Sequence, residues 1–359
     1  MNISYELALT IIFFILLIGG IFFVKHMINM QSEQAVADFI MTVGIELIVT
    51  SFGTFDDKVF AFLSHNEVQN NLVQLGTGGV LFLIGLFLMF HVKNKMYIMN
   101  INGMFHQRKI ENHHKDVGMN SFQFKEKEID FVRQYGRGVN EHISNDIVEE
   151  IEQKVNAFKM ESKDKKRGYT GVASIPFVMM AGKFFERERM DEYFEYNKFE
   201  QTYYQLIKKP FRKSYPQLTT QVQDPFASID ASTCDEVVVA ISLTAQISDE
   251  QLSQFNCPCI HLAVSGSTDN LIIYKEQLQE YVNTAYNLLM KVDRKLPKLQ
   301  NIHLVISGQS CFAFELGKLI DDNRMKAIVN YQYNVQSTPK YPWGIVLNGQ
   351  RKGQFILFG

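Results

Sequence analysis

Two short polar turns are the best candidates for chemistry in this 359-residue sequence. Each follows an apolar segment, in HLAVSGSTDN and HLVISGQSCF, and each precedes a helical pattern. A turn between a strand and a helix offers backbone N–H groups, hydroxyls and the positive end of a helix dipole, which favour an anion. The alternative is that its serines and glycines only cap helices and form tight turns. The candidate ligand-binding residues are Ser265, Gly266, Ser267, Ser307, Gly308, Gln309 and Ser310.

Motifs of common enzymes and metal sites are missing from the sequence. There is no glycine-rich dinucleotide motif, no phosphate-binding loop of the GxxxxGKS or GxxxxGKT type, no nucleophile elbow and no HExxH. Cys257 and Cys259 are close together, but no further paired cysteine or histidine stands at zinc-finger spacing. The sequence therefore predicts no catalytic residue, no metal and no cofactor, with cytosolic thiols kept reduced.

Charge is distributed unevenly along the chain. Through Val92, two lysines stand against seven acidic residues, a net charge of −5. The whole chain carries −2, which leaves +3 for the remainder. A part that is only slightly basic predicts no binding of duplex nucleic acid, although a pocket for a small anion is compatible with it.

The elements that would position the two turns alternate beyond Thr219. Short runs rich in valine and isoleucine predict strands at 236–242, 259–266, 301–308, 327–333 and 343–349. Helical spacing separates the later strands, at 269–294 and 311–320. This alternation predicts a parallel α/β sheet, and ligands of such sheets bind beyond the carboxyl ends of the strands, where both turns lie.

Apolar segments near the N-terminus predict an α-helical transmembrane module over residues 1–94, with two to three helices at about 7–24, 36–55 and 72–92. The first and third segments approach the roughly 20 uncharged residues that cross a bilayer. A secretory signal is the alternative for the first, but no Lys or Arg precedes it and no small-residue cleavage site follows. Lys93 and Lys95 follow the third segment, which places the rest of the chain in the cytoplasm.

Polar residues recur every four positions in the middle apolar segment, at Asp38, Thr42, Glu46 and Thr50, so they form one stripe along a helix. One interpretation lays this helix on the membrane surface with the stripe in water, and the chain then spans twice. In the other, the helix spans the membrane and the stripe faces a helix bundle or an aqueous path, because a carboxylate facing lipid is costly. Loop charges favour this three-span arrangement.

Residues 95–155 are polar with scattered apolar side chains, and we expect a helical connector there. Its clearest helical spacing is Ile143, Ile147, Ile151 and Val155. The cytosolic α/β domain is predicted at 156–359, with no recognisable first strand before Gly168.

The run NIHLVISGQSCFAFELGKLIDDNRMKAIVNYQYN followed by YPWGIVLNG resembles the C-terminal half of SAVED domains. The earlier GYTGVASIPFVMMAGKFF resembles the opening signature of their first half. The resemblance implies a SAVED fold of two fused CARF-like, Rossmann-type units over 156–359. It also implies a sensor of cyclic oligonucleotides in bacterial anti-phage signalling (CBASS), with a cyclic tri-adenylate as the first expectation. Together with the N-terminal helices, it implies a transmembrane effector.

The resemblance further implies roles for individual residues. Ser307 to Ser310, with Phe312, stand at the family's matching turn and helix start, and the turn at 265–267 ranks next. Tyr331 and Tyr333 are expected to stack on an adenine or bond a phosphate, with ordinary sheet packing as the alternative. Lys166 and Arg167 are expected to meet a phosphate, with a solvated loop as the alternative.

The expected mechanism is that a cyclic oligonucleotide bridges several copies of the chain, so that the homo-oligomer permeabilises the bacterial inner membrane and the infected cell dies. The chain would then cross the lipid bilayer several times, with its C-terminal domain in the cytoplasm. Two alternatives stay open. One is a membrane-tethered ring nuclease that degrades the messenger, and the other is an anchored receptor that recruits a partner, either of them in a type III CRISPR system.

Overall fold

The computed structural model describes residues 18, 19, 21, 32–51, 72–93, 95–104, 109–120 and 123–358. The chain divides into two compact units, residues 1–95 and 96–359. The predicted helix at about 7–24 lies largely outside the described residues, and so does the end of the helix predicted at 36–55.

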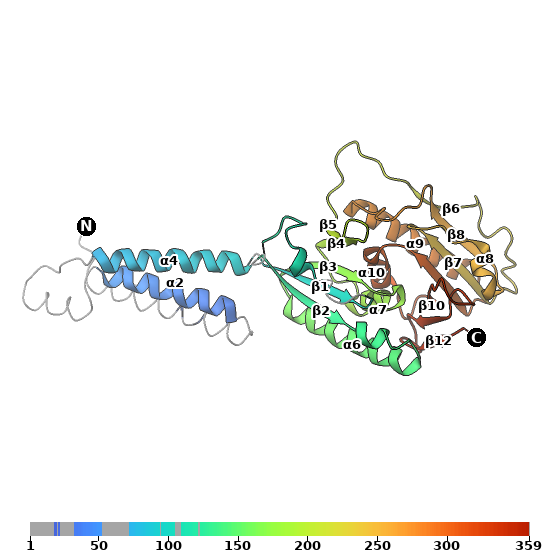
Figure 1. Ribbon diagram of the computed structural model, residues 1–359, viewed down its shortest axis with the longest axis horizontal. Coiled ribbons are helices and arrows are strands. Elements are labelled where there is room, and N and C mark those ends of the chain that lie inside the picture. The colour runs from blue at the N-terminus through green and yellow to red at the C-terminus, as the bar shows by residue number, and fades with distance from the viewer. Residues whose placement is uncertain are drawn as a thin grey trace, which may run out of the picture. The chain divides into compact units, whose positions relative to one another are not determined.

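Two described helices of the first unit pack against each other, α2 (Ser32–Thr50) and α4 (Leu72–Lys93), as Figure 1 shows. Small residues bring their backbones together. A Cβ added at Gly78 would lie 2.7 Å from the Ile48 nitrogen, and one at Gly85 would lie 2.6 Å from the Met41 nitrogen. Such close contact at glycines is typical of helix pairs in membranes. Within the described part of the chain, one helix is long and apolar enough to cross a bilayer, Leu72–Phe90.

The second unit contains two sheets (Figure 1). The first has the order β2-β1-β3-β4-β5, in which β2, β1, β3 and β4 run parallel and β5 runs antiparallel to β4. Its strands are β1 (Met96–Asn102), β2 (Phe124–Asp130), β3 (Lys166–Val172), β4 (Glu192–Asn197) and β5 (Thr202–Gln205).

The second sheet has the order β12-β11-β10-β9-β7-β8-β6. Its parallel strands are β7, β8, β9 and β10, while β6, β11 and β12 pair antiparallel with their neighbours. The strands are β6 (Leu218–Thr220), β7 (Glu236–Ser242), β8 (Cys259–Val264), β9 (Asn301–Ser307), β10 (Ala327–Gln332), β11 (Trp343–Val346) and β12 (Phe355–Leu357).

The parallel strands of the two sheets have the same order. Numbered along the chain within each sheet, both read second, first, third, fourth, as β2-β1-β3-β4 and β8-β7-β9-β10. Helices occupy equivalent places too, with α6 (Glu141–Glu161) and α9 (Lys275–Lys295) before the third strand and α7 (Ile175–Phe185) and α10 (Ser310–Leu319) after it. The described helices of this unit also include short turns, α5 (Val132–Tyr135), α8 (Asp249–Leu252), η1 (Ile110–His113) and η2 (Ser253–Phe255). The unit is therefore two Rossmann-type halves in one chain.

Helices α7 and α10 pack on each other and join the two halves. A Cβ at Gly182 of α7 would clash with the carbonyl oxygen of Phe314, and one at Gly317 of α10 would clash with that of Met179. The Phe314 ring also stacks on Tyr169 of β3, with ring centroids 4.1 Å apart. The two halves thus share one hydrophobic core.

We expect Gly182→Val to lower the free energy of unfolding by about 1–3 kcal/mol, because its side chain would force α7 away from the α10 backbone. Urea unfolding of the full chain in detergent measures this change. Gly182→Ala provides a graded comparison with an intermediate loss, and an unchanged midpoint for valine would contradict the packing argument.

The predicted helical connector at 95–155 requires correction, because β1, β2 and α6 all fall within it or begin in it. The first α/β half therefore starts at Met96, well before Gly168. Strand β1 begins three residues after the end of α4, and its partner β2 carries alternating charges, so the segment was interpreted as a polar connector. The buried side chain of Asn100 in β1 donates to Glu126 of β2 at 2.6 Å. A carboxylate of the charged neighbouring strand thus satisfies this buried amide inside the sheet.

Candidate ligand-binding site at the strand ends

A cavity of about 370 Å³ opens where strand ends of the two sheets converge. The first half contributes Met104 after β1, Gly171 to Ala173 at the end of β3, Ile175, and Glu195, Tyr196 and Lys198 of β4 and its end. The second half contributes Thr244 after β7, Asp269 and Asn270 after β8, and Gly308 to Ser310 after β9. In both halves the strand order reverses between the first and third strands, the place where open α/β sheets bind ligands.

The predicted turn after β9 reaches this cavity, but its side chains are engaged within the protein. Ser310 Oγ lies 2.6 Å from the Tyr169 hydroxyl. Gln309 Nε2 donates to the Tyr204 hydroxyl at 2.8 Å, and Gln309 Oε1 accepts from the Ile272 nitrogen at 2.5 Å. These side chains therefore fix the turn against β3, β5 and the segment before α9.

The other two residues of this turn differ in their surroundings. Ser307 Oγ accepts from the Ala245 nitrogen at 3.0 Å and lies 3.1 Å from Thr244 Oγ1, which joins the turns after β7 and β9. Gly308 lines the cavity with its backbone. A Cβ at Gly308 would meet Leu243 Cδ1 at 3.2 Å, so glycine allows the backbone to approach that turn closely.

Glu195 occupies the amino terminus of α10. Its Oε1 accepts from the Cys311 nitrogen at 2.6 Å, and only 6% of the residue is exposed. Burial raises the pKa of the Glu195 carboxyl to about 7, although the N–H groups at the start of α10 favour the charged form and limit the rise. The helix terminus that the sequence assigned to an anionic ligand is thus held by a carboxyl group of the protein itself.

The exposed charges of the cavity come from the edges of the two halves. Lys198 Nζ lies 3.1 Å from Asp269 Oδ2, with 64% and 38% of their side chains exposed. Among the described residues that line the cavity, Lys198 carries the one cationic side chain. An exposed ion pair of this kind contributes little to stability, so the Lys198 ammonium is readily re-paired with an anionic group of a ligand.

A family model described as the SMODS-associated and fused to various effectors sensor domain (SAVED) matches residues 151–347. The match covers more than half of the chain and nearly all of the cavity lining. The chain belongs to the SAVED family. The resemblance that the sequence suggested is therefore confirmed, and the α/β architecture is that of a SAVED domain. No curated protein matches the chain.

Several solved structures resemble the chain at low identity. The Acinetobacter baumannii Cap4 SAVED/CARF-domain containing receptor with the cyclic trinucleotide 2'3'3'-cAAA is 16% identical, with a TM-score of 0.45, over 91% of this chain and 66% of that one. The same receptor with 3'3'3'-cAAA is 15% identical, with a TM-score of 0.45, over 90% and 66%. The Moraxella osloensis Cap4 receptor is 17% identical, with a TM-score of 0.43, over 78% and 63%. The chain thus spans just under two thirds of the length of these receptors.

The second predicted turn of the SAVED domain, at 265–267, lies beside the cavity. Ser265 and Gly266 are exposed, and Gly266 has a φ of 77°, a conformation that favours glycine. Ser267 Oγ accepts from Gln246 Nε2 at 2.7 Å. The residues of this loop that line the cavity are Asp269 and Asn270, a few positions further along.

The three aromatic residues predicted to meet the ligand lie away from the cavity lining. Phe312 has no exposed surface and packs in the shared core. Tyr331 is 3% exposed, and its hydroxyl lies 3.0 Å from His303 Nδ1. The Tyr333 hydroxyl, on a more exposed ring, accepts from Gln251 Nε2 at 3.3 Å. The structure therefore assigns sheet packing to Tyr331 and core packing to Phe312.

Lys166 and Arg167 begin β3, whereas the cavity lies at its carboxyl end, roughly 20 Å further along an extended strand. They line a separate, larger hollow of about 1030 Å³. Lys166 pairs with Glu192 at 2.9 Å. Arg167 pairs with Glu188 and donates from Nε to Ser162 Oγ at 2.8 Å. Both cations are therefore engaged in the protein at the opposite end of the strand.

Sequence reasoning missed the first-half side of the cavity. Glu195 and Lys198 stand in the run EYFEYNK, where the aromatic residues favour a strand and were available as a signal. Asp269 and Asn270 belong to one of the two predicted turns, and Thr244 lies two residues after another predicted strand, at 236–242. The missing information was which strand ends face one another across the two halves.

The polar stripe predicted at Asp38, Thr42, Glu46 and Thr50 lies on α2. Thr42 Oγ1 donates to the Asp38 carbonyl at 2.7 Å, and Thr50 Oγ1 donates to the Glu46 carbonyl at 2.8 Å. Asp38 is buried, and Gln74 Nε2 of α4 donates to Thr50 Oγ1 at 2.7 Å. At Thr50 the stripe therefore faces a neighbouring helix.

The pKa of Glu195 predicts a pH dependence of stability. Between the ordinary value of 4.5 and about 7, the folded state keeps a proton that the unfolded chain has released. The contribution to stability is therefore complete below pH 4.5 and is lost as the pH rises toward 7, by about 3 kcal/mol in total. We expect Glu195→Gln to remove this loss. Urea unfolding of both proteins at pH 5 and pH 8 measures it, and an equal pH dependence in the two would contradict the assignment.

Proposed function

We propose that this protein is a membrane effector of bacterial anti-phage immunity. Its SAVED domain binds a cyclic oligonucleotide at the strand-end cavity, with a cyclic trinucleotide such as cyclic tri-adenylate as the first choice. Binding assembles a homo-oligomer whose N-terminal helices permeabilise the inner membrane, which ends the infection by death of the cell. The C-terminal domain works in the cytoplasm.

The sensor half of this proposal is carried by one observation, the cavity at the strand-order reversals of a SAVED domain. The family is described as a sensor fused to various effectors, and members solved with cyclic trinucleotides are described as receptors. Backbone at Gly308, amide and hydroxyl groups at Asn270 and Thr244, and the Lys198 ammonium give this cavity the donors that a phosphodiester ring requires.

The membrane half is supported by α4 and its packing with α2. Leu72–Phe90 has the length and composition of a transmembrane helix. Only 11% of it is buried within the protein, so most of its apolar surface is left to contact lipid. The buried Asp38 and the bond between Gln74 and Thr50 favour the interpretation in which the polar stripe faces other helices. A ligand that binds the assembled state more tightly than the monomer increases the population of assembled protein, and no chemical reaction is required. Because the helices are joined to the sensor, such assembly would bring the helices of several copies together.

Purified full-length protein in liposomes loaded with a fluorescent dye tests the proposal. Cyclic di-, tri- and tetranucleotides are added one at a time, and binding, particle size and dye release are followed together. We expect one cyclic oligonucleotide to bind the protein, to increase the size of the protein oligomer and to release the dye from the liposomes.

The other outcomes separate the alternatives. Tight binding without dye release would contradict the effector mechanism and favour an anchored receptor. Cleavage products of the ring, seen by mass spectrometry, would favour a ring nuclease. If none of the cyclic oligonucleotides binds, the sensor assignment fails.

A further inference from the structure

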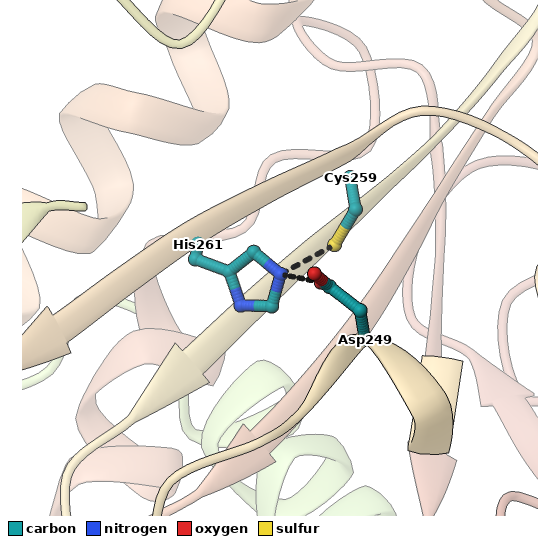
Figure 2. Close-up of side chains that lie close together, drawn as sticks. All are labelled: Asp249, Cys259 and His261. Carbon is teal, nitrogen blue, oxygen red and sulfur yellow. Dashed lines mark hydrogen bonds and ion pairs between the residues drawn. The ribbon is translucent and has the colours of Figure 1, made fainter. Parts of the chain in front are cut away.

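We propose that Asp249, Cys259 and His261 form a zinc site, separate from the strand-end cavity. Figure 2 shows the three side chains converging, with Cys259 and His261 on β8 and Asp249 at the start of α8. Their potential ligand atoms all lie within 4.8 Å of one another. They form the one group of three or more potential metal-binding side chains among the residues that the structure describes.

Two local structures bring these side chains together. Cys259 and His261 are two positions apart on β8, so they point to the same face of the sheet. Asp249 is the first residue of α8, whose start is fixed by a capping box between Ser248 and Gln251. The carboxylate is thereby held over the strand by a helix start with defined geometry.

One of the two distances from His261 Nε2 is close to that of a tetrahedral zinc site, and the other is shorter. His261 Nε2 lies 3.4 Å from Cys259 Sγ and 2.7 Å from Asp249 Oδ1. Zinc bonds of ordinary length require about 3.6 Å between the sulfur and nitrogen ligands and about 3.3 Å between nitrogen and oxygen. The first distance is already close. The second has to lengthen by about 0.6 Å, which Asp249 permits because 89% of its side chain is exposed.

The arrangement around His261 Nε2 is what distinguishes this group from a plain ion pair. One ring nitrogen faces both a sulfur and a carboxylate oxygen, although a single N–H satisfies only one of them. A metal cation bound between the three side chains would coordinate the sulfur, the ring nitrogen and the carboxylate oxygen together. With a thiolate and a carboxylate as ligands, the charges of Zn²⁺ are neutralised, and water completes the fourth position.

Ligand chemistry selects zinc over the common alkaline-earth ions. Ca²⁺ and Mg²⁺ prefer oxygen ligands, whereas a thiolate and an imidazole favour a borderline-soft ion such as Zn²⁺. The expectation from sequence that the chain holds no metal considered only cysteine and histidine at finger-like spacing. It missed a carboxylate ten positions before Cys259, which approaches only when α8 folds over β8.

The test uses the full-length chain, purified in detergent with an affinity tag that contains no histidine. Metal content is measured by mass spectrometry, and Co²⁺ is then exchanged into the site as a spectroscopic probe. We expect about one zinc per chain, and a cobalt complex with tetrahedral visible bands and a thiolate-to-cobalt charge-transfer band. Cys259→Ser should remove the charge-transfer band, and His261→Gln should lower zinc affinity more than tenfold.

Cys257→Ser is the matched control, because Cys257 lies two positions before Cys259 and outside the three-residue group. It should keep both the zinc and the charge-transfer band. Three results would overturn the proposal: wild-type protein without zinc and without a thiolate–cobalt band, a different transition metal at full occupancy, or loss of the band in Cys257→Ser but not in Cys259→Ser. The wild-type spectrum decides the question even where a variant fails to fold.

Discussion

Replacing Lys198 by glutamine should weaken binding of a cyclic oligonucleotide by roughly tenfold to a hundredfold. A hydrogen bond to a charged group is worth about 1.5–3 kcal/mol, and each 1.4 kcal/mol corresponds to a factor of about ten in affinity. Lys198 is the cationic side chain among the described residues that line the cavity, and its exposed pairing with Asp269 leaves it accessible to a phosphate. Isothermal titration calorimetry with the ligand found in the nucleotide screen measures the change.

The matched control is Lys166→Gln, which removes the same charge from the same domain. Lys166 lies at the amino end of β3 and pairs with Glu192, away from the cavity. We expect its affinity to stay within about twofold of the wild-type value. A larger loss for Lys166→Gln than for Lys198→Gln would move the binding site to the hollow that Lys166 lines.

A leucine at Gly78 should abolish most ligand-triggered dye release, with a rate at least roughly tenfold lower. The new side chain would lie between the backbones of α2 and α4, where an added Cβ would be only 2.7 Å from the Ile48 nitrogen and 2.8 Å from the Gly44 oxygen. Separating such a helix pair costs about 1–3 kcal/mol or more. Release of trapped dye from liposomes is the measurement.

Gly79→Leu is the neighbouring control, because among the described residues no atom outside the adjoining turns of α4 lies within 4 Å of a Cβ at that position. It adds the same side chain to the same helix and should release dye as the wild-type protein does. Both variants should bind the cyclic oligonucleotide with unchanged affinity, since the cavity belongs to the other unit. Equal release by Gly78→Leu and the wild-type protein would show that the contact between α2 and α4 has no part in permeabilisation.

The zinc and nucleotide proposals fail independently of each other. Asp249 and His261 do not line the strand-end cavity, so loss of zinc leaves the cavity lining in place. Conversely, Lys198→Gln leaves all three proposed zinc ligands unchanged. Measuring metal content and nucleotide binding on both sets of variants therefore assigns each effect to its own site.

The second half of the α/β domain was accessible from sequence. Continuous apolar runs such as EVVVAIS and NIHLVIS are short, rich in β-branched residues and bounded by turn residues, and they form β7 and β9. Their order with intervening helical patterns is enough to predict parallel pairing. The first half was harder, because β1 buries asparagines and β2 carries alternating charges. Local hydrophobicity does not predict a buried strand whose polar side chains are hydrogen-bonded by a neighbouring strand.

The site residues show the same difference between local features, which the sequence predicts, and long-range contacts, which it does not. The turn at 307–310 was predicted, since a strand end and a helix start are local features. The functions of its side chains were not, because the partners of Ser310 and Gln309, namely Tyr169 and Tyr204, are more than 100 positions away in the sequence. Lys166 and Arg167 carry charges that suit a phosphate, but only the strand direction shows that they lie at the amino end of β3, away from the strand-end cavity.

Three features could be predicted from the sequence alone: the polar turns at the ends of two buried parallel strands, the apolar helices before them, and the resemblance to SAVED domains. Those features follow from hydrophobic periodicity and short motifs, which act over a few residues. The folded structure was needed to show which turns share a cavity, that Glu195 accepts a hydrogen bond at the start of α10, and that Asp249 lies beside Cys259 and His261. Contacts of this kind depend on the packing of α7 on α10 and of α8 over β8, and a local pattern carries no information about either.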